Sequence, residues 1–338
     1  MRLQTTLLFL SLFSLLSLNT TAQDQETDRE KDDLKGPVMV LTQSSYKAKK
    51  EGDRVIKGSR YLQPWESDKQ YVYDKEGRKI ESYDLGLTGV KNKYTNKYAG
   101  DKLIEAASYR GEDQLEHTFV YTYNDEGNSM TYQRIDANGE KGFKRYSIYD
   151  SEDKLLELGS FESNGDLYSR NIREYDDNGN CISNDRYSGP LEELVSTTTF
   201  TYDNKNQLTK KVTLNPDGSI KEQVFYRYNE EGKLQDEATF DGNKNLKGGD
   251  SYKYDTKGNV TGHIDVKPIK ENSVRLDKTY DPNGNVTSSK TRLLSGQKIG
   301  KDHRYTYTYD AYGNWITRIT FEDEAPTRFI ERDIKYYE

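Results

Sequence analysis

A tyrosine followed by Asp or Asn, and then by Gly four positions after the tyrosine, recurs along most of this 338-residue chain. Regular copies begin at Tyr73, Tyr123, Tyr175, Tyr228, Tyr254, Tyr280 and Tyr309, and weaker copies begin at Tyr98, Tyr149 and Tyr202. The nine intervals between these anchor tyrosines all lie between 25 and 29 residues. A period held this closely predicts a repeat architecture in which each unit contacts mainly its neighbours.

The residues after each anchor tyrosine have the chemistry of a tight turn. Asp at the start of a type I turn accepts hydrogen bonds from nearby backbone N–H groups, and Gly supplies the positive φ that closes a short hairpin. Asp153 and Asn206 replace the Gly in two weaker copies, whereas Lys102 does not suit that position. The turn residues of the regular copies are Asp74, Gly77, Gly127, Asp176, Gly179, Gly232, Asp255, Gly258, Asp281, Gly284, Asp310 and Gly313.

The flanking segments have the period of two that is typical of half-buried strands. Tyr305, Tyr307 and Tyr309, for example, alternate with threonines. A second turn follows 16 residues after several anchors, at Gly139, Gly165, Gly218 and Gly296.

Each unit therefore supplies two strands, and ten units predict an all-β antiparallel meander of about 20 strands. Open twisted sheets of more than about 10 strands curl, split or close. We expect a curled or spiralling sheet, with a β-propeller as the alternative because two units would form one blade. An outer-membrane barrel is a weaker competitor, since strands such as residues 169–175 carry too much charge for a lipid-facing band.

The N-terminal part of the chain does not follow the repeat. Residues 1–22 contain Arg2 and a 12-residue apolar run, which predicts a cleaved export signal and no transmembrane segment after cleavage. Residues 23–36 are charged and predict a flexible leader. Residues 37–70 predict a hairpin region that caps the exposed edge of the array, and residues 71–338 form the array itself.

The amino-acid composition limits both the kind of core and the kind of partner that this chain can have. Only 32% of the residues are hydrophobic, but 28 are tyrosine, which argues against disorder and for a thin core. The net charge of −7 becomes −8 without the signal, so nucleic acid is not an expected partner. The single cysteine, Cys181, excludes an intramolecular disulfide.

No motif for catalysis, metal binding or a cofactor is present. His117, His263 and His303 lack the spacing of metal ligands, and no Gly-x-Ser-x-Gly segment occurs. We therefore expect no enzyme activity, no metal and no cofactor. Residues outside the repeat pattern are better candidates for function, because recurring residues serve the fold of the unit. The aromatic candidates for ligand binding are Trp65, Tyr312 and Trp315. Trp315 also has a core-packing interpretation, and Trp65 could instead seal the N-terminal hairpin region.

The run Tyr-Asp-x-x-Gly-Asn, in residues 254–259, 280–285 and 309–314, resembles the YD repeat of Rhs and teneurin-like proteins. The resemblance covers about residues 71–316 and implies a spiralling β-shell in an extracytoplasmic setting. Members of this family often enclose a toxin or other cargo, and some bind sugars or act at the cell surface. The chain departs from the large members because it lacks their self-cleavage motif, and we expect no toxin domain, since the repeats run almost to Glu338. Ten units are also few for enclosing a protein. The delivery function is therefore not implied.

Three functional hypotheses follow. The first is a non-enzymatic secreted or envelope protein that binds or scaffolds, with a polysaccharide or an envelope protein as its partner. The second is a glycan-active enzyme that uses non-repeating carboxylates in a groove of the sheet. The third, an accessory or immunity-type partner of a secretion system, rests on family analogy alone.

Overall fold

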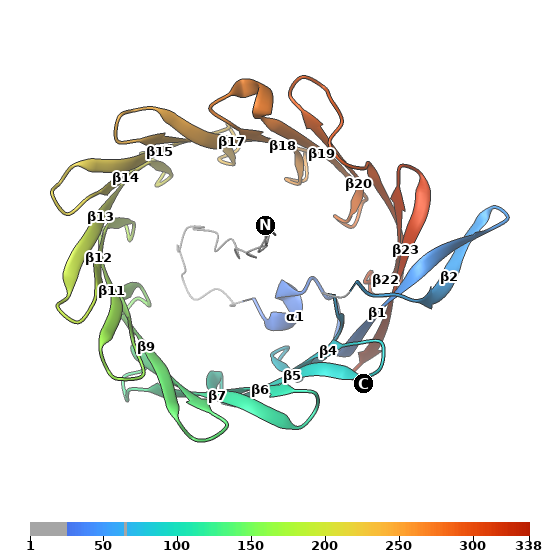
Figure 1. Cartoon of the computed structure of the whole chain (residues 1–338), viewed down its shortest axis with the longest axis horizontal. Helices are drawn as coiled ribbons and strands as arrows, with labels where there is room; N and C mark the ends of the chain where they lie inside the picture. Colours follow the sequence, from blue (N-terminus) through green and yellow to red (C-terminus); the bar gives the residue numbers. More distant parts are fainter. Residues whose placement is uncertain (1–25, 64–65) are drawn as a thin grey trace, which may run out of the picture.

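The sheet closes into a barrel. The computed structural model describes residues 26–63 and 66–338, which form 23 strands, one short α-helix and one 3-10 turn. Strands β3 to β23 follow each other as an antiparallel meander, and β1 pairs with both β3 and β23 to complete a ring of 22 strands (Figure 1). The prediction of an all-β meander is confirmed, whereas the spiralling sheet and the propeller are wrong.

The helical elements are α1 (Asp28–Lys31) and η1 (Lys270–Asn272). The strands are β1 (Val38–Glu51), β2 (Arg54–Arg60), β3 (Asp68–Tyr73), β4 (Lys79–Leu85), β5 (Val90–Ala99), β6 (Lys102–Arg110), β7 (Gln114–Tyr123), β8 (Ser129–Asp136), β9 (Lys141–Tyr149), β10 (Leu155–Phe161), β11 (Leu167–Tyr175), β12 (Cys181–Ser188), β13 (Glu193–Tyr202), β14 (Leu208–Leu214), β15 (Ile220–Tyr228), β16 (Leu234–Asp241), β17 (Leu246–Tyr254), β18 (Val260–Val266), β19 (Val274–Tyr280), β20 (Val286–Leu293), β21 (His303–Tyr309), β22 (Trp315–Glu322) and β23 (Ala325–Tyr336).

Closure has a physical reason, since an open sheet exposes unpaired backbone groups at its two edges. Here β1 supplies the missing partner to both edges. It pairs with β23 from Val38 to Lys47 and with β3 from Val40 to Gln43. This strand comes from the segment that was expected to cap one edge, and it seals the ring instead.

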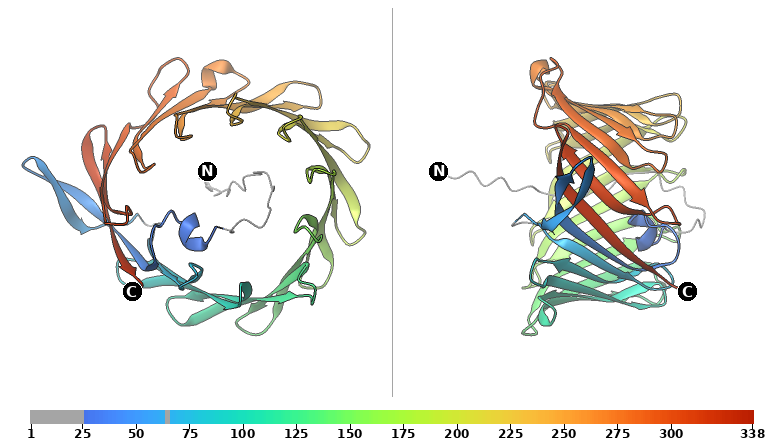
Figure 2. Two further views of the ribbon diagram at one scale, coloured as in Figure 1. Left: turned by 180° about the vertical axis from the view of Figure 1, so that it is seen from behind. Right: turned by 90° about the vertical axis from the view of Figure 1, so that its right-hand side faces the viewer.

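The second half of β1 continues away from the wall. It pairs with β2 across a turn at Gly52 and Asp53, and this hairpin projects outward from the ring (Figure 2). Two ion pairs fasten the base of the hairpin to the wall. Lys57 lies 2.8 Å from Glu331, and Arg60 lies 2.6 Å from Asp68.

The anchor turns have the predicted geometry. In the copy at Tyr254, Gly258 has φ of 90° and donates its N–H to the carbonyl of Asp255, whose Oδ1 accepts the N–H groups of Lys257 and Asn259. Asp153 and Asn206, which replace the Gly, have φ of 60° and 59°. The doubtful copy at Tyr98 differs, because Gly100 and Asp101 form a two-residue turn between Ala99 and Lys102.

Acid should weaken these turns. Hydrogen bonds from the side chain and backbone of the Asn four residues on lower the pKa of Asp176 and of Asp255 below the ordinary value of 3.8. A carboxylate whose pKa is lower in the folded state stabilises the fold above its unfolded pKa, and this stabilisation disappears as the pH falls through the folded value. We therefore expect the urea midpoint to fall steadily below about pH 4. The double variant D176N/D255N should show a shallower fall, and an equal pH dependence in the two proteins would contradict this assignment.

Alternation divides each strand between an inner and an outer face. Residues directly opposite in a ladder share a face, and Tyr71 packs against the cluster that includes Leu34 of the N-terminal segment inside the ring. Tyr71 is directly opposite Ser82, and Ser82 is directly opposite Tyr94, so all three side chains lie on the inner face. Continued around the ring, the inner face includes most anchor tyrosines, Tyr132, Tyr252 and all three histidines.

The core is thin and local. Among the described residues, nine hydrophobic side chains are buried, and four of them form one cluster at the seam where β1 joins β3 and β23: Leu34, Val38, Leu41 and Tyr73. Elsewhere the inner face is partly open, as at Tyr94, which is 39% exposed. The wall is therefore a single sheet whose inner side faces an accessible lumen. No helix in the described part of the chain is long and apolar enough to cross a membrane.

The segment that precedes β1 lies inside this lumen (Figures 1 and 2). The sequence predicts a flexible leader over residues 23–36, and the structure gives residues 26–36 specific contacts instead. Thr27 caps α1 through a capping box, and Asp32 accepts a hydrogen bond from the hydroxyl of buried Tyr73. Tyr73 needs this partner because a buried hydroxyl without one is costly.

Candidate functional site

Tyrosine hydroxyls form a belt of hydrogen bonds inside one rim of the barrel. In most units, the hydroxyl of the anchor tyrosine donates to the carbonyl of the residue that follows the previous anchor turn. The bond from Tyr254 to Leu234, for example, is 2.6 Å long. The other anchor pairs of this kind are Tyr123 to Leu103, Tyr175 to Leu155, Tyr202 to Cys181, Tyr228 to Leu208 and Tyr280 to Val260. Two tyrosines that are not anchors extend the belt, Tyr307 to Val286 and Tyr337 to Tyr73.

Burial of its ring raises the pKa of Tyr202 to about 12, so this hydroxyl stays a protonated donor even in mildly alkaline solution. The belt explains why most units have a tyrosine rather than a phenylalanine at the anchor position. It locks each unit to the one before it, so most anchor tyrosines serve the wall and not a ligand.

Removal of one belt hydroxyl should have a modest effect on stability. Tyr254→Phe is expected to lower the free energy of unfolding by about 1 kcal/mol, because the carbonyl of Leu234 loses a partner at a half-buried site. Tyr149→Phe is the matched control, since no described residue accepts a hydrogen bond from the hydroxyl of Tyr149. Urea unfolding of both variants measures the difference, and equal losses would argue against the belt.

The position five residues after the anchor tyrosine also links units, a role that the sequence alone did not reveal. Lys233 lies over the ring of Tyr254, 5.6 Å from its centroid. Asn285 donates a hydrogen bond of 2.9 Å to the hydroxyl of Tyr309. The recurrence of Asn and Lys at this position is the feature of the sequence that could have indicated this contact between units.

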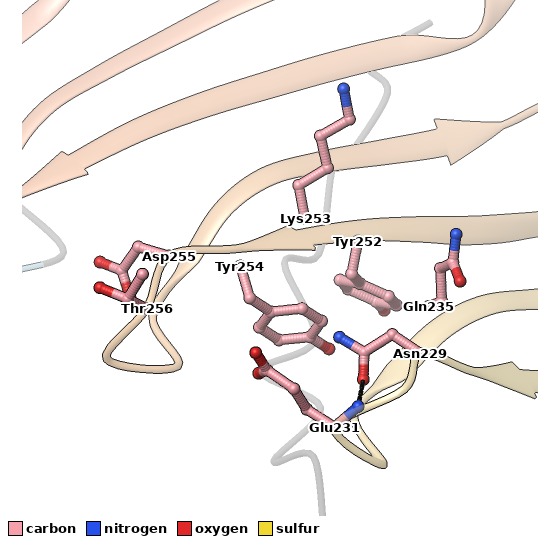
Figure 3. A pocket seen from close by; sticks show the side chains of 8 residues that line it. All are labelled: Asn229, Glu231, Gln235, Tyr252, Lys253, Tyr254, Asp255 and Thr256. Atoms are coloured by element: carbon pink, nitrogen blue, oxygen red, sulfur yellow. Dashed lines mark hydrogen bonds between the residues drawn. The ribbon is translucent and has the colours of Figure 1, made fainter.

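A shallow pocket of about 390 Å³ lies between two neighbouring anchor turns (Figure 3). The rings of Tyr252 and Tyr254 and the amide of Asn229 line it, and Glu231 stands at its edge. The main-chain N–H of Glu231 donates to Oδ1 of Asn229 at 3.1 Å, so this amide is held by its own turn. Aromatic faces beside fixed polar groups suit a sugar ring.

Three carboxylates follow each other across adjacent strands of the inner face. Glu237 on β16, Asp250 on β17 and Asp265 on β18 are directly opposite in register. Burial, and then the charge of Asp250, raise the pKa of Glu237. Asp250 is 2.5 Å from Nε2 of His263, whose ring stacks on Tyr252. This row gives the inner face a local negative charge.

Positive charge lies at the seam. The guanidinium of Arg332 on β23 stacks on Trp315 of β22, with Cζ 3.4 Å from the ring centroid, and Arg318 lies 5.5 Å from the same ring. Burial, and then the nearby Arg318, lower the pKa of Arg332 to about 10. The sequence predicted no role for either arginine.

The aromatic candidates from the sequence have different positions. Trp315 is half-buried, and one face of its ring is covered by Arg332, so it holds the wall together at the seam. Tyr312 is half exposed on the last anchor turn and stacks on Tyr336, with ring centroids 4.4 Å apart, beside Gly36. Trp65 lies outside the described residues, as does the predicted signal peptide.

Other sites for chemistry are few. The described part of the chain contains no group of three His, Cys, Asp or Glu side chains that could hold a metal ion. Burial raises the pKa of the Cys181 thiol, which favours its protonated, less nucleophilic form.

No protein-family model matches the chain, and no curated protein matches it. Among solved structures, it is similar to the crystal structure of TcdB2-TccC3-Cdc42 (15% identity, TM-score 0.42, 81% of this chain and 16% of that one). It is also similar to the Photorhabdus luminescens Tc holotoxin pore (16% identity, TM-score 0.36, 78% and 15%). A third structure, a porin-like protein from Bacteroides uniformis, has 11% identity and a TM-score of 0.27 over 89% and 98% of the two chains. This chain spans about one sixth of the toxin-complex chains that it matches.

Proposed function

We propose that this protein is an exported, non-enzymatic binding barrel that holds a carbohydrate chain against the inner face of its wall. The observation that carries the proposal is the concentration of half-exposed aromatic and hydrogen-bonding side chains on the inner face, of which Tyr94, Tyr132 and Tyr252 are examples. Rings of this kind stack on sugar faces, and neighbouring polar groups bind hydroxyls.

The outer face supports the proposal by contrast. It carries threonines and ion pairs, among them Lys97 with Glu105 at 2.6 Å and Arg170 with Glu157 at 2.9 Å, together with the aromatic pairs Tyr146–Phe161 and Phe225–Phe240. A lipid-facing wall carries an apolar band instead. An outer face rich in charged and hydroxyl side chains suits contact with water or with a polar envelope partner.

The tyrosine repeat and the N-terminal sequence support the finer parts of the proposal. The Tyr-Asp-x-x-Gly-Asn runs favour a place among YD-repeat proteins, and residues 1–22 favour export. Within that group this chain would be a short, self-closing member, because β1 provides the partner that both edges of the meander need.

The proposal is tested by two tyrosines of adjacent strands on opposite faces. Tyr94→Ser removes an exposed ring from the inner face, and Tyr83→Ser removes a ring from the outer face. Against the glycans that bind on an array, calorimetry should show affinity about tenfold weaker for Tyr94→Ser and unchanged for Tyr83→Ser. An array without any bound glycan, or equal losses in the two variants, would contradict carbohydrate binding in the lumen.

The glycan-active enzyme remains a second candidate because of Glu237 and Asp250. The two carboxylates are directly opposite in register, and the raised pKa of Glu237 is the property of a general acid. Asp250→Asn should then abolish the release of reducing ends from a bound glycan without loss of binding. A glycan that stays intact during long incubation with the unaltered protein would exclude this candidate for that glycan.

A further inference from the structure

Two arginines share one tryptophan on the inner face at the seam. Arg332 stacks on Trp315 at 3.4 Å, and Arg318 lies 5.5 Å from the same ring and 5.9 Å from that of Tyr305. Arg318 is opposite Tyr307 in one ladder and opposite buried Ile330 in the other. The two guanidinium groups are therefore held by strands of the wall and not by loops.

These two charges have no counter-charge within ion-pair distance in the described part of the chain. Arg332 donates one hydrogen bond, from Nε to Oε1 of Gln43 at 3.3 Å. The Nε of Arg318 is enclosed and has no hydrogen-bond partner among the described residues. The carboxylate of Asp32, on the segment inside the lumen, is already engaged by Tyr73 and by Lys79.

Such an arrangement is costly for a wall that needs only stability. Two like charges that are partly removed from water repel each other, and each unused donor loses its hydration. Many other cations of this wall are paired, as Lys69 is with Asp84 and Arg292 with Asp302. An anion that binds both arginines of the seam would remove both costs.

We propose that Arg318 and Arg332 bind an oxyanion in the lumen, with an acidic sugar of a polysaccharide as its source. Guanidinium groups match the planar oxygens of carboxylates and the oxygens of sulfate or phosphate with two parallel hydrogen bonds each. Trp315 acts as a positioning residue, because its ring fixes the plane of Arg332. This inference rests on the proposed function and deepens it, since it specifies that the carbohydrate is acidic.

The chain offers a direct spectroscopic test. Its only tryptophans are Trp65 and Trp315, so in a W65F background the fluorescence reports on the seam alone. Titration with oligogalacturonate should change this fluorescence, and a neutral cello-oligosaccharide of equal length should change it far less. R318Q and R332Q should each weaken oligogalacturonate binding at least about tenfold. R227Q, which removes an outer-face arginine paired with Asp236, should leave it unchanged.

Inorganic phosphate at matched ionic strength identifies the source of the anion. Phosphate that binds as tightly as the oligogalacturonate would support the oxyanion site but assign it to a free anion. Neutral and acidic sugars that bind equally, with no effect of R318Q or R332Q, would overturn this inference and leave the proposed function standing. An unchanged Trp315 signal with all three probes would also overturn it. Circular dichroism checks that the variants fold. If R318Q or R332Q does not fold, the oligogalacturonate affinity of the other variant tests the inference.

Discussion

Replacement of Tyr73 by alanine is expected to lower the free energy of unfolding by about 3–5 kcal/mol, as for other large buried aromatic residues. Tyr73 is the fully buried anchor tyrosine, with 0% of its surface exposed, and it packs with Leu34, Val38 and Leu41 at the seam. Its hydroxyl also donates a hydrogen bond to the carboxylate of Asp32, on the segment inside the lumen. The substitution would therefore disrupt the core cluster and the internal segment together.

Tyr254→Ala is the matched control for this prediction. It occupies the same position in its repeat but is half-buried and lies far from the seam. Equilibrium unfolding in urea should show a clearly larger loss for Tyr73→Ala than for Tyr254→Ala. Equal losses would mean that all units contribute alike, and the account of a core concentrated at the seam would be wrong.

Gly249→Ala, which adds a single methyl group, should lower the free energy of unfolding by about 3 kcal/mol, the upper part of the range for overpacking. Gly249 is opposite Ala238 in the ladder between β16 and β17. An added Cβ would lie 2.2 Å from the backbone oxygen of Glu237, so the backbones of the two strands would have to separate. Gly249→Ala should lower both the urea midpoint and the Tm.

Gly262→Ala on the neighbouring β18 provides the control. A Cβ there would meet no atom closer than 3.4 Å, which is ordinary contact. Because glycine within a strand is destabilising relative to alanine, this variant should be neutral or more stable by about 0.5–1 kcal/mol. If Gly249→Ala were as stable as Gly262→Ala, the register between β16 and β17 would be wrong.

The local structure could be predicted from the sequence because its causes are local. The Asp and Gly of each anchor turn determine its backbone geometry, and the alternation of residues such as Tyr305, Thr306 and Tyr307 determines which of them share a face. The positive φ of Asp153 and Asn206 follows from the same argument. Even the irregular turn after Tyr98 is signalled by a lysine where a glycine would be expected.

Closure could not be predicted in this way. A repeat specifies how each unit joins the next, but it contains no information about the partner of the first and last strands. That partner is β1, which carries no repeat motif and pairs with residues from the opposite end of the chain, as Val38 does with Tyr336. The contacts of the segment inside the lumen could not be predicted for a similar reason: its charges suggest solvent, whereas the carboxylates of Asp28 and Asp32 and the main chain of Lys35 have partners on the wall.

The candidate site was predicted only in part. The argument that function lies where the repeat pattern breaks led to Trp315, which lies beside the two arginines of the seam. Neither Arg318 nor Arg332 is distinctive among 50 Lys and Arg residues in the sequence. Their convergence depends on the pairing of β22 with β23 and of β23 with β1, and only the register shows it.

The most direct test of the closed barrel is disulfide trapping at both sides of β1 in a C181S background. Residues directly opposite in a ladder have Cα atoms about 4.5–5.5 Å apart, which a disulfide can span. Cysteine pairs at positions 40 and 72, and at positions 42 and 333, should therefore both oxidise in the folded protein, as a control pair at positions 95 and 107 within the meander should. If the control pair forms but either β1 pair stays reduced, the sheet is open at that edge and the barrel does not close.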